Sequence, residues 1–559
     1  MNNKRHNFVL VLFALVTTVM LVRMFILATY DREFLQDRGN SLAQREVSVP
    51  TTRGVIYDRS GQPLAVSTPV KSIWTDPGID TIPRDSYEDL ALALHMTVAE
   101  LERKLWDARD RRFVYLKKRA PHEISEAVEL LGIPGVRFTT EYRRYYPAAE
   151  VTAHVVGLIK NDGTGAEGLE LSHDRTLRGE VGTRRVLRSR DGRKLRDLLL
   201  VDPPKHSEGI TTTIDLGLQY LAFRHLRETV TEHEAKSATL VLIDVYSGEI
   251  LALTSYPSYN PNDGGDRAFS RMRNRAVTDT YEPGSTIKTF ASLAALETDH
   301  FEIATKVDTS PGYFGIGGHL VEDPRNYGEL SLEGVLVKSS QVGISKVALK
   351  LDKYAVFSAL NRAGVISTPH SGLPHEALAH INIEDLERDI GRATLAYGYG
   401  LRISPLQLAM GYLTLATGGV RRPVSIIRDS SRSAGSGSRV FDPSDVHDVV
   451  GMLEGVVSPI GTAPKANIAG FQVAGKTGTV RKISGGEYDE DRHIAWFVGM
   501  APSSDPRIVA VVMVDEPKGE IRSGGGVSGP VFAVVARHAL HLMGLADSQN
   551  GRKRDGDAA

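Results

Sequence analysis

The sequence predicts an α+β protein: an N-terminal transmembrane helix, then a smaller mixed module and a larger domain in which helices flank a sheet. Three observations support this prediction. A long apolar run stands at the N-terminus, strand-like segments stand at both ends of residues 211–546, and helical patterns fill much of 285–420. Strands that are distant in sequence, with helices between them, indicate one domain whose sheet joins both ends of the segment.

The apolar run begins at Phe8 and reaches Val22 with only apolar residues and threonines, and after Arg23 it continues to Ala28. A helix needs about 20 residues to cross a bilayer, so residues 8–30 are long enough for a transmembrane anchor. Arg23 lies toward one end of the run, where its long side chain can reach the membrane interface.

Lys4 and Arg5 precede the run, so the positive-inside rule places residues 1–7 in the cytoplasm and exports the remainder. The alternatives are a cleaved signal peptide and a buried core helix. A signal peptide would have a shorter apolar region and a small-x-small exit, and Ala28-Thr29-Tyr30 is a poor one. We therefore predict an uncleaved anchor with the remainder of the chain exported.

The exported part changes character near residue 211. Before it, residues 40–210 mix charged helices with short strands and form the predicted N-terminal module; after it, residues 211–546 form the predicted larger domain. We expect the following elements: strand–turn–strand at 53–65, a helix at 87–111, a helix at 216–231, a hairpin of strands 238–243 and 249–254, strands at 495–500 and 508–514, and a helix at 531–545. Residues 430–438 predict a surface loop, and 547–559 a disordered tail.

The composition excludes several classes of function. The chain has 559 residues, with 67 Lys+Arg, 68 Asp+Glu and no cysteine. A nucleic-acid-binding protein would normally carry a basic excess, so we expect no nucleic-acid partner. The missing cysteines exclude disulfides, structural cysteine–zinc sites and cysteine catalysis. Nothing in the sequence indicates a metal ion or another cofactor.

The most informative segment places Ser285 three residues before Lys288, directly after the helix breaker Pro283-Gly284. Residues three apart are neighbours on one helical face, which is the geometry for a serine nucleophile activated by a lysine. Such a lysine must be neutral when it acts, and burial or a second nearby cation can make it so. Taken alone, the motif is more often a helix cap followed by a solvated lysine.

Two further segments give this motif weight. Residues 338–346 are predicted to form a helical segment that presents hydroxyl and amide side chains, including those of Ser339 and Gln341. The second segment, Lys476-Thr477-Gly478-Thr479, lies in a strand-like stretch. A serine with a lysine, then a hydroxyl and amide element, then Lys-Thr-Gly is the order found in the penicillin-recognising acyl-serine enzymes. Residues 470–477 also match the phosphate-loop pattern letter for letter, but they alternate like a strand and open no helix, so we interpret that match as coincidence.

On these motifs the chain resembles a class B penicillin-binding protein, specifically the division-specific (septal, FtsI-type) D,D-transpeptidases of Gram-negative bacteria. The resemblance covers nearly the whole exported chain. It implies an elongated N-terminal pedestal module and a C-terminal transpeptidase domain with a central antiparallel sheet flanked by helices. Besides the three motifs, it rests on residues 53–65, 143–147 with His154, 163–170, 256–262, 273–279, 397–400, 405–409 and 499–502.

The resemblance also implies roles for individual residues. Ser285 would attack the penultimate D-alanine carbonyl of a peptidoglycan stem peptide, Lys288 would take its proton, and Ser339 would relay a proton to the leaving amine. Lys476, with the hydroxyls of Thr477 and Thr479 on either side of Gly478, would bind the substrate carboxylate. Backbone N–H groups of Ser285 and Thr479 would form the oxyanion hole. β-Lactams would acylate Ser285, and partners would include a septal glycan polymerase and other division proteins.

Two departures from the family pattern are expected to matter. Gln341 stands where the family has Asn, and it carries its amide one methylene further out, so contacts with Lys288 and with the substrate must be re-aimed. Arg522-Ser523 stands where the septal family usually has a tyrosine pair, which predicts an altered drug-side pocket. Two alternatives to a septal transpeptidase remain: a weakly active or non-catalytic division scaffold, and a serine β-lactamase, which the anchor and the large N-terminal module disfavour.

Overall fold

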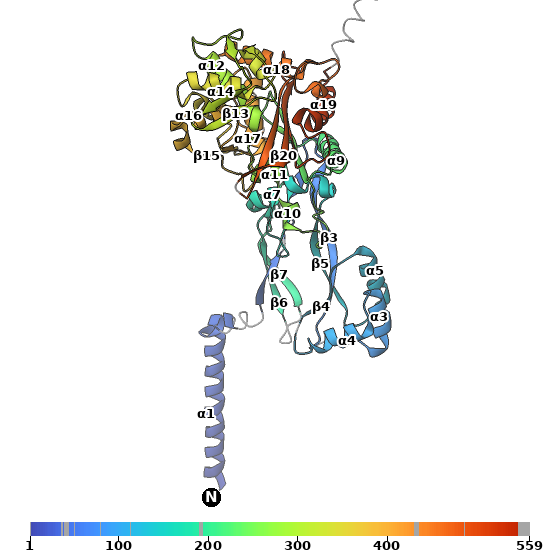
Figure 1. Ribbon diagram of the computed structural model, residues 1–559. Coiled ribbons are helices and arrows are strands. Elements are labelled where there is room, and N and C mark those ends of the chain that lie inside the picture. Colours follow the sequence, from blue (N-terminus) through green and yellow to red (C-terminus); the bar gives the residue numbers. More distant parts are fainter. Residues whose placement is uncertain are drawn as a thin grey trace, which may run out of the picture. The chain divides into compact units, whose positions relative to one another are not determined.

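The computed structural model describes residues 2–34, 37–38, 44–49, 51–78, 80–111, 113–188, 194–429, 435–485 and 487–545 (Figure 1). The chain divides into two compact units, Met1–Gly54 with Arg178–Ser207, and Val55–Leu177 with Glu208–Ala559. The predicted tail at 547–559 and part of the predicted loop at 430–438 lie outside the described residues.

The first unit contains the predicted anchor and a small sheet. Helix α1 (Asn2–Thr29) includes the stretch Lys4–Thr29, whose mean hydropathy of 2.6 and lack of burial against protein suit a membrane-spanning helix. The sheet has the order β1-β6-β7, with β1 (Gln44–Val49), β6 (Gly182–Arg188) and β7 (Lys194–Asp202). Its neighbouring strands are antiparallel.

The second unit begins with a sheet built around one long strand. Strand β3 (Pro63–Thr75) pairs with β2 (Ile56–Tyr57), β4 (Val114–Ala120) and β5 (Arg137–Tyr145), and β2 pairs in parallel with β8 (Ile210–Thr211). Helices α3 (Tyr87–Ala93), α4 (Val98–Trp106) and α5 (His122–Leu131) enclose a small separate core with β3 and β4. The strand–turn–strand prediction at 53–65 is confirmed.

The prediction of one helix over 87–111 is wrong, because the chain breaks between α3 and α4. His95 adopts a positive φ of 55°, which no helix allows, and Thr97 then caps α4. The Thr97 hydroxyl accepts from the N–H of Glu100 at 3.2 Å, and the Glu100 carboxylate accepts from the N–H of Thr97 at 2.8 Å. This capping box starts a new helix where the charge pattern had suggested continuity.

The larger domain is built on a five-stranded antiparallel sheet of order β10-β9-β21-β20-β19. Its strands are β9 (Ser237–Asp244), β10 (Ile250–Tyr256), β19 (Ala474–Ser484), β20 (Glu487–Ala501) and β21 (Ile508–Asp515). Helices α9 (Leu216–Glu232) and α19 (Gly524–Leu542) pack on one face, and α17 (Pro405–Ala416) packs on the other (Figure 1). The predicted sheet joining both ends of the domain is confirmed.

Shorter elements complete the described parts of both units. The helices are α6 (Ala153–Val156), α7 (Gly168–Ser172), α8 (Asp174–Arg178), α10 (Phe269–Met272), α11 (Arg275–Thr278), α12 (Lys288–Leu296), α13 (Leu332–Val337), α14 (Gln341–Lys350), α15 (Ala355–Ala363), α16 (Asp389–Ala396) and α18 (Pro443–Val457), with 3-10 turns at Arg84–Ser86, Ala149–Val151, Gly284–Ile287, Ile383–Glu387 and Pro464–Ala466. Two-stranded pairs are formed by β11 (Lys306–Asp308) with β14 (Glu329–Ser331), β12 (Tyr313–Ile316) with β13 (His319–Glu322), β15 (His380–Ile381) with β16 (Leu401–Arg402), and β17 (Val420–Arg421) with β18 (Ser438–Arg439).

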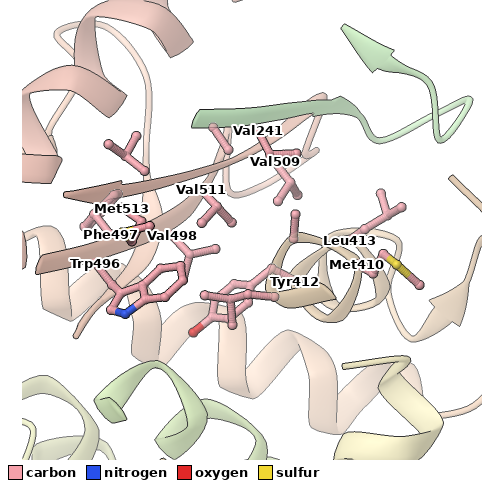
Figure 2. Packing of buried hydrophobic residues seen from close by; sticks show 14 of the residues in the cluster. Val241, Met410, Tyr412, Leu413, Trp496, Phe497, Val498, Val509, Val511 and Met513 are labelled. Atoms are coloured by element: carbon pink, nitrogen blue, oxygen red, sulfur yellow. The ribbon is translucent and has the colours of Figure 1, made fainter. Parts of the chain in front are cut away.

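The core of the larger domain covers both faces of the sheet, and one part of it lies between the sheet and α17. Figure 2 shows Trp496 and Val498 of β20 and Val511 of β21 beside Tyr412 of α17. Trp496 and Tyr412 are fully buried, and burial of such large side chains contributes several kcal/mol to folding. The edge strand β19 lies next to β20, so this core supports one wall of the site described below.

A buried ion pair joins β5 to α7. The Nε atom of Arg144 lies 2.6 Å from Oε1 of Glu170, and the two side chains are 2% and 0% exposed. Two of the segments that carry the family resemblance, 143–147 and 163–170, thus meet through opposite charges. Such a pair is costly to break on one side only, because the remaining charge stays buried.

We expect Glu170→Gln to lower the free energy of unfolding by about 3–5 kcal/mol, because Arg144 loses the buried carboxylate that balances its charge. The double variant Arg144→Met/Glu170→Leu should cost less, since it removes both charges and keeps apolar volume. Urea denaturation of the detergent-solubilised protein measures both. A double variant that is less stable than Glu170→Gln would contradict this account.

Candidate active site

The segment that carries Ser285 turns tightly before it becomes a helix. Residues Gly284–Ile287 form a 3-10 turn, and α12 begins at Lys288, so the predicted helix starts three residues later than Ser285. The hydroxyl of Tyr412, on α17, donates to the carbonyl O of Thr286 at 2.9 Å and so fixes the turn. Ser285 is half-buried, and its side chain makes no hydrogen bond within the described residues.

Glycines let two other segments approach this turn closely. A Cβ atom at Gly398 would lie 2.0 Å from the carbonyl O of Gly284, and one at Gly478 would lie 2.8 Å from the carbonyl O of Pro283. Gly478 is opposite Trp496 in the β19–β20 pair. The Lys-Thr-Gly strand therefore passes against the nucleophile turn only because residue 478 has no side chain.

Ser339 lies in a break between two helices, not within a helix as the prediction for 338–346 implied. Helix α13 ends at Val337, Ser339 has a positive φ of 59°, and Ser340 caps α14 by accepting from the N–H of Gly343 at 2.8 Å. The carboxylate of Asp323 accepts from the N–H of Gln341 at 2.5 Å and from the hydroxyl of Ser340. These bonds hold Ser339 in a left-handed conformation that few non-glycine residues adopt.

Three elements bring two lysines to one hydroxyl. Lys476, on β19, donates to Oγ of Ser339 at 2.9 Å, and Lys288, on α12, donates to the same oxygen at 3.2 Å. Lys288 also donates to the carbonyl O of Ser339. Both lysines are fully buried. Since the Ser339 oxygen accepts hydrogen bonds from the amino groups of both lysines, its own proton is free to point toward a ligand.

The electrostatics of this cluster favour a neutral amine. Burial lowers the pKa of Lys288 well below its ordinary value, and the positive charge of Lys476 lowers that pKa further, while the carboxylate of Asp323 acts in the opposite direction. Burial also lowers the pKa of Lys476 to about 7. A lysine amine that is neutral near pH 7 can accept a proton from a serine hydroxyl.

The remaining predicted residues line the neighbouring cleft. Gln341 and Thr479 border a cavity of about 860 Å³ together with Tyr397, Tyr399 and Tyr488. Thr479 is exposed, and its hydroxyl accepts from the N–H of Gly524 at 3.2 Å. The side chain of Gln341 makes no hydrogen bond within the described residues, so its amide is available to a ligand in the cleft.

The side chain of Thr477 is buried and contacts another threonine. Its hydroxyl is 2.8 Å from that of Thr462, and the residue is 7% exposed. Arg522 forms an ion pair with Asp491 at 3.5 Å, and Ser523 caps α19 by accepting from the N–H of Gly526 at 3.2 Å. The residue at 523 is therefore also a structural element of α19, since a tyrosine there would remove the cap.

Sequence reasoning did not single out Asp323, Glu282, Tyr412 or Trp496, which all support the site. Asp323 holds the Ser339 break, and Tyr412 holds the Thr286 carbonyl. The indole N–H of Trp496 donates to the carbonyl O of Glu282 at 3.1 Å. Glu282 directly precedes the Pro283-Gly284 breaker. The others belong to no motif, because their partners come from other parts of the chain.

Comparison with known proteins agrees with this architecture. Residues 238–537 match the family described as penicillin-binding protein transpeptidase domain, and residues 48–211 match the one described as penicillin-binding protein dimerisation domain. The chain therefore belongs to the penicillin-binding protein transpeptidases, in their class B.

Relatives match along nearly the full chain. A probable peptidoglycan D,D-transpeptidase (PbpC) of Pseudomonas aeruginosa is 37% identical over 550 residues, covering 98% of this chain and 97% of the relative. The peptidoglycan D,D-transpeptidase FtsI of Escherichia coli K12 is 38% identical over 533 residues, covering 94% of this chain and 90% of the relative. These relatives and the apolar helix α1 are consistent with a single-pass inner-membrane protein.

Solved structures show the same fold. The transpeptidase domain of penicillin-binding protein 3 from Burkholderia pseudomallei has a TM-score of 0.55 and 36% identity, covering 60% of this chain and 97% of that one. A peptidoglycan synthetase from Bifidobacterium adolescentis has a TM-score of 0.71 over 90% of this chain and 98% of its own, and at 23% identity it supports the fold alone.

We expect Lys476→Gln to move the pH profile of acylation upward by roughly 1 pH unit. We expect the neutral amine of Lys288 to be the form that takes the serine proton, so the rate should rise as the pH increases through the pKa of Lys288. Removing the charge of Lys476 raises that pKa, and the rising limb moves to higher pH. Stopped-flow measurement of penicillin acylation from acidic to alkaline pH tests this.

Lys482→Gln is the matched control for this experiment. It removes the same charge from the same strand, but Lys482 is paired with Asp515 at 2.7 Å and Glu516 at 2.6 Å. The acylation rate of Lys482→Gln should rise over the same pH range as that of the wild-type protein. If Lys476→Gln lowers the maximal acylation rate but the rate still rises over the wild-type pH range, Lys476 acts on the substrate alone.

Proposed function

We propose that this protein is a D,D-transpeptidase that cross-links stem peptides of septal peptidoglycan through an acyl-enzyme on Ser285, and that β-lactams inhibit it by acylating the same serine. The observation that carries this proposal is the Ser339 oxygen held between two fully buried lysines, 2.9 and 3.2 Å away. That arrangement supplies a neutral amine on Lys288, three residues after the proposed nucleophile Ser285, and acyl transfer by a serine needs such a base.

Acylation would begin with Ser285. Its Oγ attacks the carbonyl carbon of the penultimate D-alanine, and its proton passes to the neutral amine of Lys288. The negative charge that develops on the carbonyl oxygen is stabilised by the backbone N–H groups of Ser285 and Thr479, each of which is typically worth ~10²–10³ in rate. Gly478 permits this, because it brings β19 against the nucleophile turn.

The leaving amine needs a proton to depart as D-alanine. Ser339 is suited to deliver it, because its oxygen accepts hydrogen bonds from both lysines and its own O–H is free. The Lys288 ammonium formed in the first step replaces that proton. An amine of a neighbouring stem peptide then attacks the acyl-serine carbonyl, and the proton it loses passes through Lys288 to the departing Oγ of Ser285. A peptide cross-link forms, and the catalytic groups return to their initial states.

The terminal carboxylate of the stem peptide would lie near Lys476 and Thr479. A bound carboxylate raises the pKa of Lys476 and so restores its positive charge. Gln341 would hydrogen-bond the substrate amide from the opposite side of the cleft. Thr477 contributes through its backbone and through the bond that ties β19 to Thr462.

The location of the protein follows from the same proposal. Residues 1–7 are cytoplasmic, 8–30 cross the inner membrane, 40–210 form a non-catalytic pedestal and 211–546 the periplasmic transpeptidase domain. Lys4 and Arg5 support this orientation. A transpeptidase acts on glycan strands that another enzyme has polymerised, so a septal glycan polymerase and other division proteins are the proposed partners.

Labelling with a fluorescent penicillin tests the proposal. We expect the full-length protein to form a stable adduct and Ser285→Ala to form none. If the wild-type protein is not labelled, the result would favour the non-catalytic scaffold, the alternative suggested by Gln341 in place of the family's Asn. Rapid turnover of penicillin without an accumulating adduct would favour a β-lactamase. An adduct on Ser285→Ala would refute the assignment of the nucleophile.

We expect Gln341→Leu to slow acylation by roughly 10–100-fold, because leucine keeps the volume and removes the amide that faces the cleft. Gln341→Asn keeps an amide one methylene shorter and should fall between leucine and wild type. The second-order rate constant for penicillin acylation measures all three. Equal constants for Gln341→Leu and wild type would show that the side chain does not touch the ligand.

A further inference from the structure

Glu282 lies three residues before Ser285, and the mechanism above gives its carboxylate no task. The carboxylate is half-buried and reaches two segments that border the cleft. Its Oε1 atom accepts from the N–H of Gly400 at 3.0 Å and from the hydroxyl of Tyr488 at 3.3 Å, and Oε2 is 3.4 Å from the same hydroxyl. One side chain thus ties the 397–400 segment to strand β20.

One of the two groups that Glu282 holds belongs to an aromatic wall, which we define as Tyr397, Tyr399 and Tyr488, and the other, the N–H of Gly400, directly follows Tyr399 in the chain. The ring of Tyr488 lies edge-on to that of Tyr399 with centroids 5.3 Å apart, and Tyr399 lies edge-on to Tyr397 at 5.5 Å. All three tyrosines border the cavity that also contains Gln341. Tyr488 is 44% exposed and comes from the end of a strand, so packing alone holds it weakly.

The backbone of Glu282 is fixed independently of its side chain. Its carbonyl O accepts from the indole N–H of the fully buried Trp496 at 3.1 Å. The N–H of the preceding Tyr281 donates to the carbonyl O of Ile403 at 2.9 Å. The carboxylate therefore extends from a rigid base, so it can position mobile groups around it instead of following them.

The charges around Glu282 are consistent with this role. Burial raises the pKa of Glu282, while the hydrogen bonds from Gly400 and Tyr488 and the positive charge of Arg402 oppose that rise. Burial and the carboxylate together raise the pKa of both Tyr399 and Tyr488. The phenol of Tyr488 therefore stays protonated and can donate to Glu282 at neutral pH.

We propose that Glu282 is a positioning residue that fixes the aromatic wall against which the chain of an incoming stem peptide, or the side chain of a β-lactam, packs before Ser285 reacts. This inference rests on the proposed function. It assigns Glu282 to ligand binding and not to the chemical step, because its contacts go to the wall and not to Ser285, Lys288 or Ser339.

Ligand binding and the chemical step can be separated by saturation kinetics of acylation by benzylpenicillin, measured with the full-length protein in detergent. Glu282→Ala should raise the dissociation constant of the non-covalent complex about tenfold and leave the limiting acylation rate within about twofold. Glu282→Gln should behave nearly as wild type, because both hydrogen bonds converge on one oxygen and the glutamine carbonyl can accept both.

Tyr488→Phe keeps the ring and removes the hydroxyl, and because Tyr488 is partly exposed this variant does not depend on core packing. It should raise the dissociation constant by a smaller factor than Glu282→Ala. The double variant Glu282→Ala/Tyr488→Phe should bind no more weakly than Glu282→Ala, since the bond is already lost. Glu487→Gln, an exposed charge removed from the same strand, is the control and should match wild type.

Each outcome of these measurements either supports or contradicts the proposed role of Glu282. A wild-type protein that forms no adduct removes the proposed function, and this inference with it. If wild type is acylated at Ser285 and Glu282→Ala has an unchanged dissociation constant, or if its loss lies in the limiting rate, the inference alone is overturned. The inference would also be overturned if Glu282→Gln were as defective as Glu282→Ala. It would likewise be overturned if the effects of Glu282→Ala and Tyr488→Phe on the dissociation constant were fully additive.

Discussion

Two lysine side chains without access to water, converging on the single oxygen of Ser339, are the constraint on which the site depends. Burying two like charges together is expensive, and the protein lowers the cost by lowering the pKa of both amines. The proposed acyl transfer needs such a neutral amine as its base. In that proposal the reactivity of the site follows from where the chain buries Lys288 and Lys476.

The rest of the domain serves to bring these groups together. Lys288 comes from α12, Ser339 from the break before α14, and Lys476 from the edge strand β19. The sheet and α17 provide the rigid base, since Trp496 and Tyr412 each hold a backbone carbonyl of the nucleophile segment. Asp323 completes the arrangement, because it holds the helix break that turns Ser339 toward both lysines.

Sequence patterns predicted the elements whose signal is local and periodic. The helix near 216–231, the hairpin of β9 and β10, and the strands β20 and β21 follow from apolar runs and turn residues. The break at His95 was missed, although Thr97 and Glu100 carry a readable capping box. The motif residues were recognised from their order along the chain. Asp323 and the left-handed Ser339 could not be, because their conformations depend on partners that only the folded chain supplies.

The glycine contacts behind Ser285 restrict how the protein can acquire antibiotic resistance. No side chain fits at Gly398 or Gly478 without moving the backbone that presents the nucleophile. A substitution that excludes a drug while admitting the stem peptide must therefore arise elsewhere, at exposed positions on the rim such as Tyr488. The close backbone contacts leave little room for substitution at these two glycines, so exposed positions at the edge of the cleft are the part of the site on which selection by antibiotics can act.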